Sequence, residues 1–182
     1  MSELASKAQS SFYFTSTPSS WVGHGETELI TPENGSISLA QVVYDSGLHL
    51  AITTTSGEDW YLDFGTSTRG NLSDGMYANA TRFPFNNGSS PGLSFIGQGR
   101  GDNTLTGWFD VLDIIYSGST VTSAAVDFVQ YDEGYVSWEN YGSIRYNSAI
   151  PIDFTPIPEP QSLVFAAIGG LSMLILKKKS VK

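Results

Sequence analysis

The chain has 182 residues, of which 18 are acidic and nine are basic, and its formal net charge at pH 7 is −9. This acidic surplus argues against nucleic acid as a partner, because phosphates would repel the protein. The chain has no cysteine and only two histidines, which excludes disulfide crosslinks and leaves little for a histidine metal site.

Alternation of apolar and polar residues dominates the body of the chain and predicts short β-strands rather than helices. The predicted strands cover 37–43, 48–52, 60–64, 75–83, 93–96, 104–116, 121–130 and 138–146. Turns rich in glycine, asparagine and serine separate them. Eight or nine short strands at nearly regular spacing predict an all-β domain over residues 1–150, built as an antiparallel β-sandwich or barrel.

The longest predicted strand, 104–116, carries apolar side chains on both of its faces. Simple alternation puts Trp108, Leu112, Ile114 and Tyr116 on one face and Phe109, Val111 and Ile115 on the other. We therefore expect a central strand that is covered on both sides.

Acids and aromatic residues near the end of the body are candidates for binding or hydrolysing sugars. Asp132, Glu133 and Glu139 are interleaved with Tyr135, Trp138 and Tyr141. A glycosidase needs two carboxylates at a defined separation, one with a raised pKa, whereas a non-catalytic carbohydrate-binding module needs a row of exposed Trp and Tyr. No nucleophile elbow and no phosphate-binding glycine loop occurs in the sequence. We therefore expect a protein that is not an enzyme and has no catalytic or cofactor-binding residues.

Structural calcium is left open as the one candidate cofactor. The acids near predicted turns are Asp59, Asp63, Asp102, Asp132 and Glu133. The sequence lacks an EF-hand loop, and solvated surface acids are the simpler interpretation. The RGD tripeptide at 100–102 is likewise interpreted as a turn between strands. The sequons at Asn34, Asn71, Asn79 and Asn87 are interpreted as polar turn residues.

The last part of the chain has a different character. A proline-rich linker, 151–157, leads to the tripeptide Pro158, Glu159, Pro160, then to an uncharged apolar run, 163–176, and then to Lys177, Lys178 and Lys179. As a helix the run would reach about 21 Å, short of the roughly 30 Å hydrocarbon core of a bilayer. Local thinning and lysine snorkelling allow such a span to cross. We predict a single transmembrane helix at 163–176 with a basic tail, 177–182.

Charge fixes the expected orientation of this span. Residues 1–160 hold all 18 acidic residues but only five basic ones, a net charge of −13, whereas the remainder carries +4. The positive-inside rule then puts the lysines in the cytoplasm and the N-terminal body across the membrane.

The ordered tail at 158–182 resembles the PEP-CTERM sorting signal of Gram-negative bacteria. The resemblance implies recognition by a membrane-embedded exosortase, cleavage near the motif, and transfer of the body to the cell surface or its release. Exosortase and inner-membrane lipid are the implied partners, and extracellular polysaccharide is a further one. An exported chain is expected to begin with a signal peptide. Residues 1–10 lack the basic and apolar regions of one, so we expect the true start to lie upstream or the chain to be truncated.

Residues 60–148 also resemble a β-rich domain that recurs in bacterial surface proteins of undetermined function. The shared stretches include Phe83-Pro84-Phe85, Gly99-Arg100-Gly101 and the run at 142–148. That domain carries one cysteine after Gly-Arg-Gly and another before Glu-Gly. Here the two places hold Asp102 and Asp132, so the resemblance implies that two acids replace a disulfide.

The sequence thus predicts a non-enzymatic, exported protein of the cell surface or extracellular matrix, sorted by an exosortase through the tail at 158–182. The alternative is a β-sandwich module that binds carbohydrate, in particular an exopolysaccharide. The exposure of Trp21, Trp60, Trp108 and Trp138 distinguishes them, since burial of all four would remove the basis for carbohydrate binding.

Overall fold

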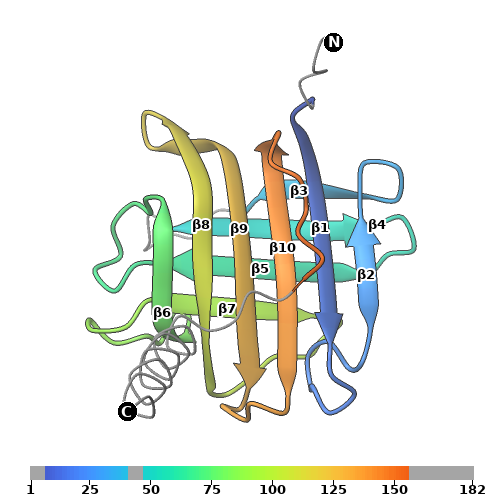
Figure 1. The fold of residues 1–182 in the computed structure, drawn as a ribbon, viewed down its shortest axis with the longest axis vertical. Coiled ribbons are helices and arrows are strands. Elements are labelled where there is room, and N and C mark those ends of the chain that lie inside the picture. The colour runs from blue at the N-terminus through green and yellow to red at the C-terminus, as the bar shows by residue number, and fades with distance from the viewer. Residues whose placement is uncertain (1–6, 41–46, 156–182) are drawn as a thin grey trace, which may run out of the picture.

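The computed structural model describes residues 7–40 and 47–155, which form ten β-strands (Figure 1). In chain order these are β1 (Gln9–Ser16), β2 (Thr27–Ile30), β3 (Gly35–Leu39), β4 (Leu48–Thr54), β5 (Asp59–Gly65), β6 (Gly75–Arg82), β7 (Gly92–Gly97), β8 (Leu105–Ser117), β9 (Thr120–Asp132) and β10 (Glu139–Ser148).

The strands form one sheet in the order β2-β1-β10-β9-β8-β6-β7-β5-β4-β3. In Figure 1 the front layer holds β6, β8, β9, β10, β1 and β2, while β7, β5, β4 and β3 run crosswise behind it. Neighbouring strands pair antiparallel except β6 and β7, which pair parallel at the fold between the layers. The edge strands β2 and β3 are joined by a tight turn at 31–34. The sheet therefore returns to its own start and forms a nearly closed, barrel-like structure.

Side chains that point inward from both layers meet in one core rich in aromatic rings. Phe12, Phe14, Trp60, Phe95 and Phe128 are completely buried. The ring centroids of Phe14 and Trp60 lie 4.7 Å apart, and those of Trp60 and Phe95 stack at 5.2 Å. Because these rings come from β1, β5, β7 and β9, aromatic packing joins the two layers.

The all-β class predicted from the alternation is confirmed, with ten strands in place of eight or nine. The two additional strands, β1 and β2, precede the first predicted one. In β1 the consecutive aromatic residues at 12–14 hide the alternation, although Phe12 and Phe14 point into the core and Tyr13 points out. The four residues of β2 are too few to show a period.

The predicted strand 104–116 matches β8 in extent, but the prediction of which side chains share a face is partly wrong. The register between β8 and β9 skips Leu112. This β-bulge reverses the alternation. As a result Ile114 and Tyr116 pack against the main core with Phe109, and not beside Trp108 as predicted.

Within residues 7–40 and 47–155 no helix is long and apolar enough to cross a membrane. The predicted span, 163–176, the sorting motif and the basic tail lie outside the described residues. Of the expected linker, the structure describes 151–155. Together with 149 and 150 these residues lie along the outer face of β10, and we call 149–155 the strap.

Candidate functional site

Three loops meet at the lower end of the molecule in Figure 1, and we call this region the loop end. It comprises residues 17–26 between β1 and β2, 98–104 between β7 and β8, and 133–138 between β9 and β10. Thr17 donates its hydroxyl to the Ser137 carbonyl at 2.8 Å, and Arg100 Nε donates to the Val22 carbonyl at 2.8 Å. The loops therefore brace one another instead of extending separately into solvent.

Asp132, the last residue of β9, is the centre of a buried polar network beneath these loops. Its Oδ2 accepts hydrogen bonds from Ser20 Oγ at 2.7 Å and from the Val22 amide at 2.9 Å. Its Oδ1 accepts from Asn140 Nδ2 at 2.6 Å and from Gln130 Nε2 at 3.2 Å. Four donors from three segments thus compensate the burial of this carboxylate.

Asp102 joins the same network from the β7–β8 loop. Its side chain is 3% exposed, and its Oδ2 accepts from Gln130 Nε2 at 2.9 Å. Its Oδ1 is buried and has no hydrogen-bond partner among the described residues. Burial, the negative charge of Asp132 and a hydrogen bond with that side chain raise the pKa of Asp102 to about 8. At neutral pH Asp102 is therefore mainly protonated and Asp132 lies beside a neutral carboxyl group.

The sequence identified both aspartates but missed the polar side chains that join them. Gln130 is completely buried and also bridges to β7, where it bonds to the amide and the carbonyl of Phe95 at 2.8 and 3.0 Å. Asn140 is completely buried as well. The burial of Gln130 could have been predicted from the alternation along β9, because Gln130 follows Val126 and Phe128 at every second position, on the face that points inward.

This arrangement does not have the accessibility of a glycosidase site. Glu133, which was considered together with Asp132 and Glu139, accepts hydrogen bonds from the Asn103 amide and the Thr104 hydroxyl. The hydrogen bond from the Asn103 amide is the main cause that lowers the pKa of Glu133. Among the acids named as candidates from the sequence, the one with a raised pKa is Asp102, which is buried together with Asp132. A glycan in solvent cannot reach either of these two carboxyl groups, and their geometry fits a clamp that holds the loops.

The other acids considered for calcium are dispersed over the sheet. Asp59 accepts from the Thr53 hydroxyl at 2.7 Å, and Asp63 lies 2.9 Å from Nδ1 of His49. In the part of the chain that the structure describes, no three His, Asp or Glu side chains come together as a metal site would require. Asp102 of the RGD tripeptide is buried, which agrees with its interpretation as a turn.

Asn34 and Asn87, the first residues of two sequons, lie in turns, as predicted. Asn34 Oδ1 accepts from the Thr31 amide at 2.7 Å, and Asn87 Oδ1 accepts from the Ser89 amide at 3.0 Å. The interpretation of Asn79 is wrong, because Asn79 lies within β6 at an irregular position of the pairing with β8.

The tryptophans do not form the exposed row on a sheet face that a sandwich-type carbohydrate module would need. Trp60 is completely buried and Trp108 is 2% exposed. Trp138 is half-buried, and its ring packs 4.9 Å from that of Tyr135. Trp21 is 53% and Tyr135 58% exposed, both on the loop end. Two exposed aromatic side chains, Trp21 and Tyr135, thus lie on loops, whereas Tyr61, 42% exposed, lies on β5.

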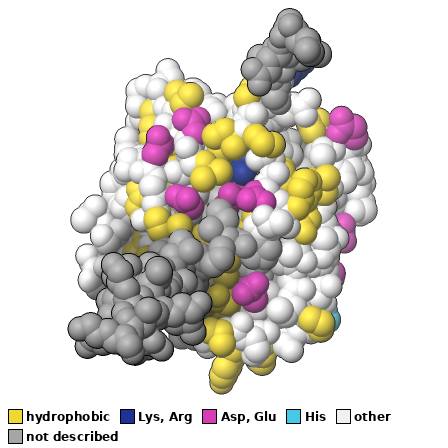
Figure 2. Space-filling view, in the orientation of Figure 1, with side chains coloured by type: hydrophobic (Ala, Val, Ile, Leu, Met, Phe, Trp, Pro, Cys, Tyr) yellow, Lys and Arg dark blue, Asp and Glu magenta, His cyan; other side chains and the backbone are white. Residues whose placement is uncertain are grey.

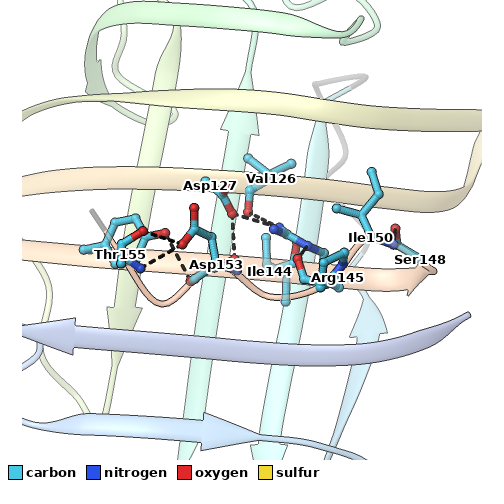
Figure 3. A network of polar contacts seen from close by, with 11 residues as sticks. Val126, Asp127, Ile144, Arg145, Ser148, Ile150, Asp153 and Thr155 are labelled. Carbon is cyan, nitrogen blue, oxygen red and sulfur yellow. Dashed lines mark hydrogen bonds and ion pairs between the residues drawn. The ribbon is translucent and has the colours of Figure 1, made fainter. Parts of the chain in front are cut away.

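A second polar network fixes the strap to the outer face of the front layer (Figure 3). Arg145 and Asp127 form an ion pair at 2.8 Å, with both side chains almost completely buried. Arg145 Nε donates to the Pro151 carbonyl at 3.0 Å, and the Tyr141 hydroxyl donates to the Asp153 carbonyl at 3.2 Å. Figure 2 shows acidic and hydrophobic side chains around a basic one in the middle of this face. The strap therefore covers charges that would otherwise need water.

The residues predicted to form the sorting site, Pro158, Glu159, Pro160 and Lys177 to Lys179, lie outside the described residues. The chain matches no protein-family model, and searches of curated proteins and of solved structures also found no match.

Proposed function

We propose that this chain is a non-enzymatic, exported protein of the cell surface or extracellular matrix, which an exosortase sorts through residues 158–182. The observation that carries the proposal is the ordered tail together with the charge difference, −13 up to Pro160 and +4 beyond it. The body would lie outside the cytoplasm, first at the inner membrane and, after processing, at the surface.

The position of the fold relative to the motif supports this assignment. All ten strands of the described sheet end by Ser148, before Pro158 in the sequence, and the strap lies along the surface of the front layer. Cleavage near the motif would therefore leave the body's strands and their pairing intact. The carboxyl groups of Asp102 and Asp132 are buried inside the fold, where solvent and a substrate do not reach them. Such a body fits a structural or interaction role.

Localisation in a host that makes an exosortase tests the proposal. We expect the full chain, behind a functional signal peptide, to reach the surface, where added protease digests it on intact cells. Replacing Pro158, Glu159 and Pro160 together by alanine should retain the chain in the inner membrane, as should deletion of the exosortase gene. The matched control is Pro156→Ala, which changes a proline outside the motif and should not alter delivery. Surface delivery of the triple variant would contradict the proposal.

The second candidate function is binding of extracellular carbohydrate. It is favoured by the exposed rings of Trp21 and Tyr135, because large aromatic side chains exposed on loops that brace one another are suited to stacking on sugar rings. Trp21 is held between two anchored neighbours, since Ser20 and the Val22 amide both bond to Asp132. Binding of a neutral oligosaccharide that Trp21→Ala or Tyr135→Ala abolishes would support this role.

A further inference from the structure

Ser20 holds a nucleophilic oxygen against a side-chain amide inside the buried network beneath the loop end. Its Oγ lies 2.6 Å from Asn140 Oδ1 and 2.7 Å from Asp132 Oδ2. All three side chains are at most 1% exposed. A hydroxyl, an amide carbonyl and a carboxylate are the groups that acyl transfer requires as nucleophile, electrophile and general base.

The hydrogen bonds of the Ser20 hydroxyl do not balance. The hydroxyl has one proton, but two acceptors, Asp132 Oδ2 and Asn140 Oδ1, lie within 2.7 Å of its oxygen. Turning the Asn140 amide over does not help, because its nitrogen would then face the Gly23 amide N–H and its oxygen would face Asp132. When the proton lies toward Asp132, the Ser20 and Asn140 oxygens are left in contact through their lone pairs. A covalent bond from Oγ to the Asn140 side chain would relieve this contact, since an ester oxygen needs no proton to share.

The Gly23 amide lies where negative charge would develop in such a reaction. Its N–H is 3.0 Å from Asn140 Oδ1 and also 3.0 Å from Ser20 Oγ. A donor at this distance from a carbonyl oxygen can stabilise the oxyanion of a tetrahedral intermediate. A β-carbon on Gly23 would lie 2.5 Å from Asn140 Oδ1, so glycine is what allows the backbone to approach so closely.

We propose that Ser20 and Asn140 condense into an intramolecular ester and release ammonia. Ser20 Oγ attacks the side-chain carbonyl carbon of Asn140 while the hydroxyl proton passes to Asp132. The carbonyl electron pair moves onto Oδ1, beside the Gly23 N–H. When the intermediate collapses, the C–N bond breaks, and its electron pair stays on the nitrogen, which takes the proton from Asp132 and leaves as NH₃. Asp132 Oδ1 already accepts from that nitrogen at 2.6 Å, so one carboxyl group serves both proton transfers.

The reaction requires a small movement of the hydroxyl and the exclusion of water. Ser20 Oγ contacts the oxygen of the amide, whereas attack needs it about 3–3.5 Å from the carbonyl carbon and above the amide plane. That carbon is bonded directly to Oδ1, so rotation about the Cα–Cβ bond of Ser20 is a sufficient kind of motion. Burial of the three side chains keeps water from competing with the hydroxyl and from hydrolysing the ester.

The ester would tie the β1–β2 loop to β10, at positions that are 120 residues apart. The chain has no cysteine, so it has no disulfide with which to make a comparable link. A permanent bond between the first and last strands' ends goes beyond the structural role proposed above. It does not depend on delivery by the tail, and it can be measured whether or not the chain is sorted.

Peptide mass mapping of the full chain, purified in detergent and incubated at pH 8, tests for the ester. Trypsin cleaves after lysine and arginine, which places Ser20 in peptide 8–69 and Asn140 in peptide 101–145. We expect one joined species whose mass is the sum of the two peptides less about 17 Da, the mass of ammonia. Two separate peptides of unchanged mass, from a chain that has the circular dichroism of a folded β-protein, would overturn the proposal.

Three variants assign the roles. Ser20→Ala removes the nucleophile and should leave the peptides separate. Ser143→Ala is the matched control, because Ser143 is also buried and donates to a carboxylate, Asp127 Oδ1 at 2.6 Å, outside this network; the joined species should persist. Asp132→Asn removes the base and should slow joining by about 10²- to 10⁴-fold. Joining in Ser20→Ala would place the bond elsewhere and contradict the assignment. If a variant does not fold, fragmentation of the joined wild-type peptides still locates the bond.

Mild alkali in water enriched in oxygen-18 distinguishes the ester from other losses of ammonia, such as succinimide formation at Asn34 or Asn87, each of which precedes a glycine. Hydrolysis should separate the peptides, restore Ser20 and leave an aspartate at position 140 that carries the heavy isotope. A joined pair that survives alkali would not be an ester. A loss of ammonia without joining would indicate a succinimide, and either result would count against the proposal.

Discussion

Asp102 and Asp132 accept hydrogen bonds from the same amide nitrogen, Gln130 Nε2, at 2.9 and 3.2 Å. This shared donor brings a residue of the β7–β8 loop to the end of β9, at the point where the β1–β2 loop is also attached. Two carboxyl groups so close together in a buried site cannot both ionise cheaply. Retention of a proton by Asp102 is therefore part of what holds the loop end together.

The first prediction concerns pH and Asp102→Asn. Asp102 binds its proton more tightly in the folded chain, where its pKa is about 8, than in the unfolded chain, where the pKa is near 3.8. A rise in pH between about 4 and 8 thus lowers the free energy of unfolding through this group, and above about 8 the effect is complete. An asparagine carries no charge at any pH, so the variant should gain stability relative to wild type across this window, by on the order of a few kcal/mol at pH 9.

Urea unfolding of both proteins at pH 5, 7 and 9 measures this difference. Asp113→Asn, on β8 outside the network, is the control, and its stability relative to wild type should stay level over the same pH range. A difference between Asp102→Asn and wild type that did not grow with pH would contradict the assigned protonation.

The second prediction is that Asp102→Cys combined with Asp132→Cys forms a disulfide in oxidising buffer. Both carboxyl groups lie within hydrogen-bond distance of one amide nitrogen, so the two side chains converge on the same place. Formation of the disulfide tests whether the two β-carbons approach to the roughly 3.5–4.5 Å that a bridge requires. Closing a loop of this length should stabilise the oxidised form relative to the reduced form by about 3–4 kcal/mol. The comparison isolates the crosslink, because both redox forms have lost the hydrogen bonds that Asp132 accepts.

Mass spectrometry after alkylation, followed by thermal unfolding with and without reductant, checks this outcome. Asp113→Cys with Asp132→Cys is the matched control. Asp113 pairs with Ala125, well along β9 from Asp132, and the two thiols should stay reduced. Free thiols in the first variant under oxidising conditions would show that the two positions are not close enough to be bridged.

The third prediction is a large loss of stability in Arg145→Met. This change leaves Asp127 charged and buried without its partner and also removes the bond from Arg145 Nε to Pro151. Breaking a buried ion pair in this way typically costs about 3–5 kcal/mol. Arg145→Lys should lose less stability than Arg145→Met, because it keeps the positive charge beside Asp127. It should still be less stable than wild type, because lysine lacks the guanidinium that bonds to both Asp127 and the Pro151 carbonyl.

Denaturant unfolding at pH 7 measures the loss, and the rate of proteolytic cleavage after Ser148 reports release of the strap. The control is Arg69→Met, an exposed arginine whose guanidinium donates one described hydrogen bond, to the Pro84 carbonyl. It should change stability by less than about 1 kcal/mol. Equal losses in the two variants would argue against a special role for the Arg145 pair.

The alternation in the sequence was enough to predict the fold class and most of the strands, because a sheet with one face in the core imposes a period of two. It failed at 9–16, where Phe12, Tyr13 and Phe14 are all aromatic although the structure uses both faces of β1. It also failed beyond Leu112, since a bulge adds one residue to a strand without leaving a mark in the hydrophobic pattern.

The polar network was only partly accessible to prediction. The resemblance to the recurrent β-rich domain paired Asp102 with Asp132 as two acids in place of a disulfide, and the structure brings both side chains to one donor, Gln130 Nε2. Their contact depends on the pairing of β8 with β9 and on the turn that carries Asp102 back toward Gln130. The irregular pairing of β6 at Asn79 was not predicted at all. It depends on two residues of β6 standing opposite one of β8, and that register is set by the three-dimensional fit of the sheet.

The pairing of β1 with β10 joins the two ends of the described chain, since Phe12 lies opposite Ile144. Contacts between positions so distant in sequence form late and make folding slow. In a protein threaded across a membrane from its N-terminus, β1 can pair with β2 early, but its other neighbour, β10, is missing until the segment 139–148 has emerged. Under the export proposed here, the body would stay unfolded and compatible with translocation until just before the sorting motif arrives, and the order of the strands would itself delay the completion of folding.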